Sequence, residues 1–154
     1  RHLPDAHCII HTHTTAGMAV SACAEGLRPI SFYAAAFAGQ IAYHDFEGVT
    51  IRPEEGDRLI ANLGSKRVMM LRNHGTLVMA ASLPEAFLKH WSLQRACEIQ
   101  VAASAAGTPV DIPADVIAVH QRDLAGVQLP VGPGVPDFQA MVRVIDRIDS
   151  SWRQ

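Results

Sequence analysis

The stretch HCIIHTH, residues 7–13, decides the fold expected of this chain and points to its chemistry. Its apolar part, Cys8–Ile10, is typical of a buried strand, and two histidines follow it. Because side chains on a strand alternate between its two faces, His11 and His13 should project from the same face. Two imidazoles that project together can bind one ion. The stretch therefore predicts part of a metal site at the end of a strand.

A third histidine follows another apolar run much later in the chain. Residues 68–71 read Val-Met-Met-Leu, and the motif N-H-G comes shortly after them at residues 73–75. If the two strand ends meet, His11, His13 and His74 converge and leave a position open for water or substrate, as in catalytic zinc sites. An H-x-H pair alone is often a hydrogen-bonded structural feature, so the third histidine is what favours a metal. Imidazole suits several ions, and we expect zinc or another divalent transition metal.

Composition indicates a globular domain and excludes several classes of function. The 154 residues suffice for one domain with a core, and 49% of them are hydrophobic. The formal net charge is −2 and no Lys/Arg stripe stands out, so nucleic acid is not an expected partner. The apolar stretches are too short for a bilayer, so no membrane partner is expected, and the first residues do not form a signal peptide. Cys8, Cys23 and Cys97 form no C-x-x-C motif and are expected to be reduced, buried thiols of a cytoplasmic protein.

The rest of the pattern alternates strands with helices. Strands are expected at residues 7–12, 49–51, 67–72 and 76–80. Helices are expected at residues 14–25, 32–39, 53–63, 83–106, 114–125 and 137–152. Five prolines between positions 108 and 136 divide a domain of residues 1–107 from a Pro-rich connection and C-terminal helix, residues 108–154. That last helix is amphipathic and is expected to pack on its own domain or on a neighbouring subunit.

Three longer strings are specific enough to suggest a family. They read HCIIHTHTTAGMAVSACAEGLRPIS at residues 7–31, AYHDFEG at residues 42–48 and LRNHGTLV at residues 71–78. Together with the spacing from H-x-H to N-H-G, they resemble the class II aldolase/adducin family, and its adducin-like branch most of all, over about residues 4–107. The Y-H-D string is typical of that branch. Its histidine, His44, could reach the site or cap a turn, and we favour the structural role.

The resemblance implies a fold, a site and a reaction. The fold would be α/β, a three-layer α/β/α sandwich around a mostly antiparallel sheet, assembled as a homotetramer with sites between subunits. His11, His13 and His74 match the histidines that bind the ion in the family. Its aldolases stabilise an enediolate on the ion, and a tyrosine of the next subunit, matched by Tyr33 if a small gap is allowed, protonates the leaving oxygen. We therefore expect a metal-dependent aldolase-type lyase acting on a small sugar or sugar phosphate.

Two features of the family's enzymes are absent from this sequence. Their catalytic Glu or Asp precedes the H-x-H motif by more than the ten residues that stand before His11 here, and their phosphate-binding loops lie earlier still. We therefore expect the N-terminal part of the fold to be missing. The chain would then be a fragment of a longer parent protein, and the fragment itself would be inactive.

Other functions agree with parts of the pattern. Adducins use this fold as a non-catalytic assembly module of the membrane skeleton, which makes a scaffold domain the main alternative, although residues 149–154 lack the Lys-rich extension of adducins. Amidohydrolases also have H-x-H at a strand end, but they need a barrel of ~250 residues and a late aspartate ligand, for which Asp111, Asp115 and Asp123 are poor candidates. A cupin would need a glutamate shortly after the second histidine, and residues 14–18 contain none.

Overall fold

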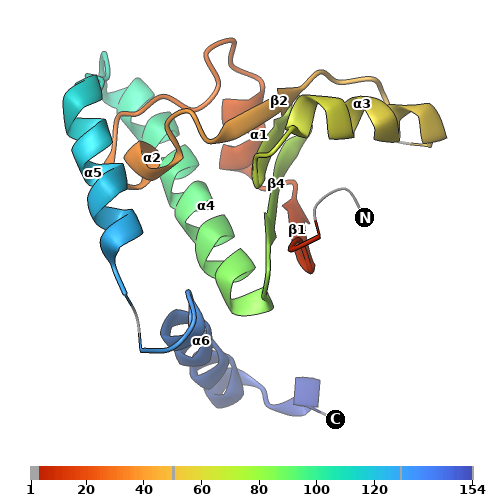
Figure 1. Ribbon diagram of the computed structural model, residues 1–154, viewed down its shortest axis with the longest axis vertical. Coiled ribbons are helices and arrows are strands. Elements are labelled where there is room, and N and C mark those ends of the chain that lie inside the picture. Colours follow the sequence, from red (N-terminus) through yellow and green to blue (C-terminus); the bar gives the residue numbers. More distant parts are fainter. Residues whose placement is uncertain (1–3, 50, 129, 154) are drawn as a thin grey trace.

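Four short strands form one sheet in the computed structural model, which describes residues 4–49, 51–128 and 130–153 (Figure 1). The strands are β1 (Cys8–Thr12), β2 (Ile41–His44), β3 (Val68–Leu71) and β4 (Gly75–Ala80). Their order across the sheet is β1-β4-β3-β2. Strand β4 pairs antiparallel with both β1 and β3, whereas β2 pairs parallel with β3. The predicted mostly antiparallel sheet is thus confirmed.

Six α-helices and one 3-10 turn accompany the sheet in the described part of the chain. They are α1 (Thr15–Ser21), α2 (Phe32–Phe37), α3 (Pro53–Leu63), α4 (Leu83–Ala106), α5 (Ala114–Gly126), α6 (Val135–Ile148) and η1 (Ser151–Arg153). Side-chain caps explain where several of them begin. The hydroxyls of Thr14, Ser31 and Ser82 accept hydrogen bonds from backbone N–H groups in the first turns of α1, α2 and α4.

Helices cover both faces of the sheet, which gives the three-layer α/β/α architecture that was expected. On one face, α1 and α4 bury Val20 and Leu93 against the strands, and Met70 belongs to the same core. On the other face, α3 buries Leu63 in a second core that contains Met69. Successive methionines of β3 therefore point into different cores. A strand buried on both faces reads as a continuous apolar run, which is the pattern of residues 68–71.

One predicted strand is wrong, and one observed strand is not predicted. Within residues 49–51, Val49 lies in a bend and Ile51 has no regular structure, while Thr50 lies outside the described residues. The side chains of Val49 and Ile51 are each 77% exposed, so these β-branched residues do not belong to a strand here. The fourth strand is β2, Ile41–His44, which is buried on both faces and therefore lacks an alternating pattern.

The cysteines differ from one another in exposure. Cys97 is fully buried on α4, but Cys8 is half-buried and Cys23 is exposed. The reason for the exposed thiol is that α1 ends at Ser21, earlier than the helix predicted for residues 14–25. The prediction of buried thiols therefore holds only for Cys97.

The C-terminal helices extend the sandwich. Helix α5 packs against α2, and α6 packs against one end of α4 (Figure 1). The chain enters α6 through Gly134, whose φ of 73° and proximity to the carbonyl oxygen of Pro84 leave no room for a Cβ. Several apolar side chains of α6 remain exposed: Met141, Val144, Ile145 and Ile148. The division at residue 107 stays a prediction.

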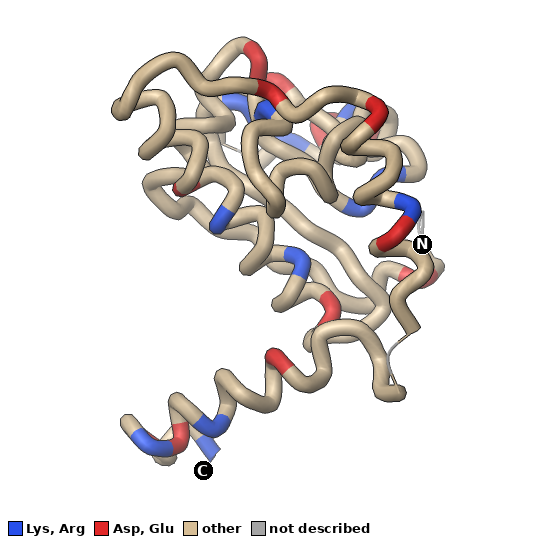
Figure 2. Tube along the Cα trace, turned by 90° about the vertical axis from the view of Figure 1, so that its left-hand side faces the viewer, with Lys and Arg blue, Asp and Glu red and all other residues tan. Residues whose placement is uncertain are grey.

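Charges of both signs are mixed along the described chain (Figure 2). Figure 2 shows Lys and Arg interspersed with Asp and Glu along the trace. None of the described helices combines the length and the apolar character that crossing a bilayer requires.

Candidate functional site

The imidazole rings of three histidines lie together at one end of the sheet, where β1 ends and β3 turns into β4. The ring centroids of His11 and His13 are 4.6 Å apart, and the centroid of His74 lies 5.0 Å from the first and 4.7 Å from the second. One ligand nitrogen of each ring lies within 4.8 Å of the other two. The two strand ends therefore meet, as the sequence indicates. Binding of a metal by these rings stays a prediction.

The turn between β3 and β4 is what brings His74 to this place. Asn73 adopts a left-handed φ of 57°, which asparagine tolerates better than most residues. Gly75 then packs directly against the end of β1. A Cβ at this position would lie 2.4 Å from the carbonyl oxygen of Thr12 and 3.1 Å from Cδ2 of His13. Only glycine therefore allows the two histidine motifs to approach this closely.

The hydrogen bonds of His11 fix which of its nitrogens faces the cluster. Its Nδ1 lies 2.9 Å from the carbonyl oxygen of Thr76, which can only accept, so Nδ1 donates and Nε2 presents a lone pair. Nε2 of His13 lies 2.8 Å from Nε2 of His11 and donates to its lone pair. The two Nε2 atoms would together hold a metal ion in place of this hydrogen.

Burial and neighbouring rings favour the uncharged form of two histidines, His74 and His90. Burial, followed by the nearby His11 and His13, lowers the pKa of His74 below its ordinary value. Burial, followed by His11, also lowers the pKa of His90, whose Nε2 lies 2.8 Å from the hydroxyl of Thr12. Since a metal binds neutral imidazole, the donor set, the fixed tautomer and the lowered pKa all fit a divalent transition metal.

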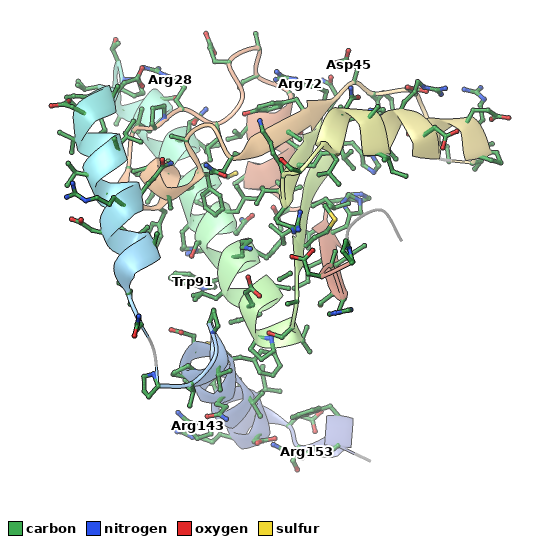
Figure 3. The ribbon with its side chains drawn as sticks, in the orientation of Figure 1. Arg28, Asp45, Arg72, Trp91, Arg143 and Arg153 are labelled. Carbon is green, nitrogen blue, oxygen red and sulfur yellow. The ribbon has the colours of Figure 1, made fainter. Side chains whose placement is uncertain are left out.

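A cavity of about 260 Å³ adjoins the histidine cluster. Its wall comes from the end of β2 and the loop after it, the first turns of α3 and the hairpin between β3 and β4. His11 and His74 belong both to the cluster and to this wall. The other polar residues of the wall are His44, Asp45, Glu47, Glu55 and Arg72. Figure 3 shows Asp45 and Arg72 at this end of the sheet. A ligand bound at the cluster can therefore extend into the cavity.

His44 is the most buried polar residue of this wall, only 4% exposed. Its Nδ1 lies 2.7 Å from Oδ1 of Asn62 on α3. Its Nε2 is buried and has no hydrogen-bond partner in the described residues. One carboxylate oxygen each of Glu47 and Glu55 lies 3.8 Å from that nitrogen. The structural role favoured by the sequence accounts for the bond to Asn62 but not for the free nitrogen.

Tyr33 lies away from the cluster within one chain. Its ring packs against Trp91 of α4, with ring centroids 5.6 Å apart, and it does not line the cavity. Figure 3 shows Trp91 part way along α4. Because the family resemblance places the acid in a neighbouring subunit, the role of Tyr33 stays a prediction.

Glu55 is one of the wall residues that sequence reasoning missed, with Glu47 and Arg72. In the first turn of a helix, an acid usually faces water and stabilises the helix N-terminus. Here it is only 6% exposed. The signal that could have found it is its spacing, because Glu55, Leu59 and Leu63 are four residues apart and share one face of α3.

Comparison with known proteins is consistent with this arrangement. The family described as Class II Aldolase and Adducin N-terminal domain matches residues 1–101. A Pseudomonas aeruginosa protein named for aldolase class 2 is 38% identical over 97% of this chain and 59% of its own length. Alpha-adducin of Rattus norvegicus is 40% identical over 94% of this chain and 21% of its own length.

Solved structures give the same result. An aldolase II superfamily protein from Pseudomonas syringae has a TM-score of 0.89 and 40% identity, over 97% of this chain and 60% of its own. L-fuculose 1-phosphate aldolase from Glaciozyma antarctica has a TM-score of 0.67 and 26% identity, over 79% of this chain and 45% of its own. The two Pseudomonas proteins match nearly all of this chain, which spans only about 60% of their own length.

Proposed function

This chain belongs to the class II aldolase and adducin family, and on that premise we propose that it provides the metal site of an aldolase-type lyase acting on a small sugar or sugar phosphate. The observation that supports this most is the convergence of His11, His13 and His74 beside a cavity. The similarity to L-fuculose 1-phosphate aldolase supports the same class of reaction.

Each residue of the site has a distinct part in this proposal. His11, His13 and His74 hold zinc or another divalent transition metal. A bound divalent ion supplies Lewis-acid stabilisation of the negative charge that develops on a substrate oxygen. The carbonyl of Thr76 keeps His11 in the tautomer that coordinates. Tyr33 of a neighbouring subunit donates a proton to the leaving oxygen.

The proposal includes an assembly and a location. A proton donor from the next subunit requires an oligomer, and we propose a homotetramer in the cytoplasm. Exposed apolar side chains on α6, such as Ile145 and Ile148, support a contact between subunits because they would otherwise face water. Native mass spectrometry measures the assembly directly.

Metal analysis followed by an activity screen tests this function. We expect one zinc-group ion per chain in protein purified without chelators, and loss of that ion in the double variant His11→Ala/His13→Ala. The screen for aldol cleavage uses the parent protein, because this chain spans only part of the length of its relatives. Lack of a bound metal in the folded protein would contradict the proposal.

A non-catalytic scaffold remains the second candidate, and one observation favours it. Alpha-adducin is as similar to this chain as the bacterial proteins are, at 40% identity. A scaffold domain would assemble without metal, and its assembly would be unchanged by the double histidine variant. A lyase would lose metal and turnover together in the same variant, so the two functions are separable.

A further inference from the structure

We infer that the cavity beside the histidine cluster is a subsite for an uncharged, hydroxyl-bearing part of the ligand, and that Nε2 of His44 forms a hydrogen bond with one of its hydroxyl groups. The inference rests on the proposed function, because the ligand is anchored at the metal site. It adds the chemical class of the group beyond the anchor and names the residue that selects it.

The hydrogen bond on the far side of His44 decides what this residue can recognise. Its Nδ1 lies 2.7 Å from the side-chain carbonyl oxygen of Asn62, which only accepts, so Nδ1 donates. Nε2 is then the ring nitrogen left for a ligand. This nitrogen is buried and finds no partner within the described ranges of the chain. A buried polar nitrogen without a partner is unfavourable, and a ligand hydroxyl in the cavity, which can donate or accept, relieves that cost.

The charges around this nitrogen oppose an anionic ligand group. The carboxylates of Glu47 and Glu55 each have an oxygen 3.8 Å from Nε2, and Asp45 adds a third acid to the wall. Arg58 pairs with Glu47 and neutralises it in part. The basic residue of the wall is Arg72, whose guanidinium already donates to a backbone carbonyl and lies over a tyrosine ring. A phosphate or carboxylate would meet like charge here, whereas a hydroxyl can donate to every acceptor.

The remaining wall is apolar and suits the C–H groups of a polyol. It consists of Phe46, Leu59, Leu71 and Leu77. The ring of Phe46 has its centroid 6.1 Å from that of His74, so this surface continues from the proposed metal site. Apolar walls with a few placed polar groups are typical of small-molecule sites. The cavity of about 260 Å³ accommodates a short hydroxylated chain.

Three chelators of matched length test the inference on zinc-loaded protein. They are butanohydroxamate, 3,4-dihydroxybutanohydroxamate and succinic monohydroxamate, which end in apolar, hydroxylated and anionic groups. Isothermal titration calorimetry first measures zinc binding and then the affinity of each chelator. We expect the dihydroxy compound to bind about tenfold more tightly than the apolar one, and the anionic one to bind most weakly.

Variants assign any preference to His44. We expect His44→Phe to remove the preference for the dihydroxy compound while the affinity for butanohydroxamate changes less than about twofold. The matched control is His120→Phe, because His120 also has a buried Nε2 without a hydrogen-bond partner in the described residues but does not line this cavity. That variant should keep the preference.

A measurement on the unsubstituted protein covers the case in which His44→Phe does not fold. Long-range ¹H–¹⁵N NMR of the zinc-loaded protein should show the Nε2 resonance of His44 moving with the dihydroxy compound and not with butanohydroxamate. A resonance that does not move, or equal affinities for the two compounds, overturns the inference and leaves the proposed function intact. Failure to bind zinc overturns the proposed function and this inference with it.

Discussion

The Nε2 atoms of His11 and His13 lie 2.8 Å apart, and a single hydrogen lies between them because Nδ1 of His11 already donates to the carbonyl of Thr76. The lone pair on Nε2 of His11 can accept either this hydrogen or a metal ion. Metal binding should therefore displace the hydrogen bond between the two rings.

Loss of the third ring should weaken metal binding strongly. His74→Ala removes one of the three proposed ligands, and we expect zinc affinity to fall by about 100-fold or more. Competition with a chromogenic zinc chelator measures the affinity. The control is His120→Ala on α5, which should bind zinc as the unsubstituted protein does. Equal affinities in the two variants would exclude His74 as a ligand.

The close approach of the two histidine motifs predicts a steric effect at Gly75. In Gly75→Ala the new Cβ would lie 2.4 Å from the carbonyl oxygen of Thr12, so the hairpin must shift. We expect a loss of about 1–3 kcal/mol in the free energy of unfolding and weaker zinc binding. Urea denaturation and zinc titration measure the two effects.

The control for this substitution is Gly56→Ala, within helix α3. A Cβ at this glycine would meet nothing within 4 Å. Because glycine is unfavourable inside a helix, the change should stabilise the protein by about 0.5–1 kcal/mol and leave zinc binding unchanged. If both alanine variants behaved alike, the packing argument for Gly75 would be wrong.

The convergence of the histidines could be anticipated from sequence because it depends on local rules. Alternation along a strand places His11 and His13 on one face, and an N-H-G turn after an apolar run predicts a hairpin that contains His74. The cavity could not be anticipated in the same way. Its wall joins β2, a strand without an alternating pattern, to Glu55 of α3, and only the tertiary packing brings these elements together.

The errors in the fold have similar causes. Val49 and Ile51 have a strong intrinsic preference for strands, yet both are exposed and neither lies in a strand. Intrinsic preference stabilises a strand less than burial of its side chains does. Ile41–His44 has that burial and pairs with β3. Family resemblance supplied the layered architecture, which periodicity alone does not predict.

Acid should destabilise the metal-free protein in a defined window. The pKa values of His74 and His90 are lowered, mainly by burial, so the unfolded state binds protons more readily than the folded state. The contribution of these two neutral histidines to the free energy of unfolding is therefore fully present above about pH 6.5, the ordinary pKa of histidine. It falls as the pH drops below that value. Carboxylates with lowered pKa values, such as Asp5 and Glu47, titrate below this window.

Urea midpoints measured between pH 7.5 and 5.5 test this prediction. We expect them to fall with pH, and the double variant His74→Gln/His90→Gln to show a weaker dependence because its side chains do not titrate. Added zinc should raise the midpoint at pH 7.5 and lose this effect toward pH 5.5, since protons compete for the same nitrogens. A midpoint that rises on acidification would contradict the direction of both shifts.

The three cysteines should react with a thiol reagent at very different rates. Cys23 is exposed and should react rapidly at pH 8, whereas Cys97 is buried in α4 and burial raises its pKa to about 12, so almost no thiolate is present. Cys8 is half-buried at the edge strand and should react at an intermediate rate. Mass spectrometry after a short pulse of iodoacetamide identifies the labelled sites.

Labelling in denaturant shows whether burial causes the difference in reaction rate among the three thiols. In urea above the unfolding midpoint all three thiols should react alike, because the unfolded chain removes the burial that protects Cys97. Cys23→Ser should abolish the rapid phase in the folded protein and leave the slow one unchanged. Rapid labelling of Cys97 in the folded state would show that α4 separates from the sheet in solution, and would contradict the core in which that thiol lies beside Met70 and Leu93.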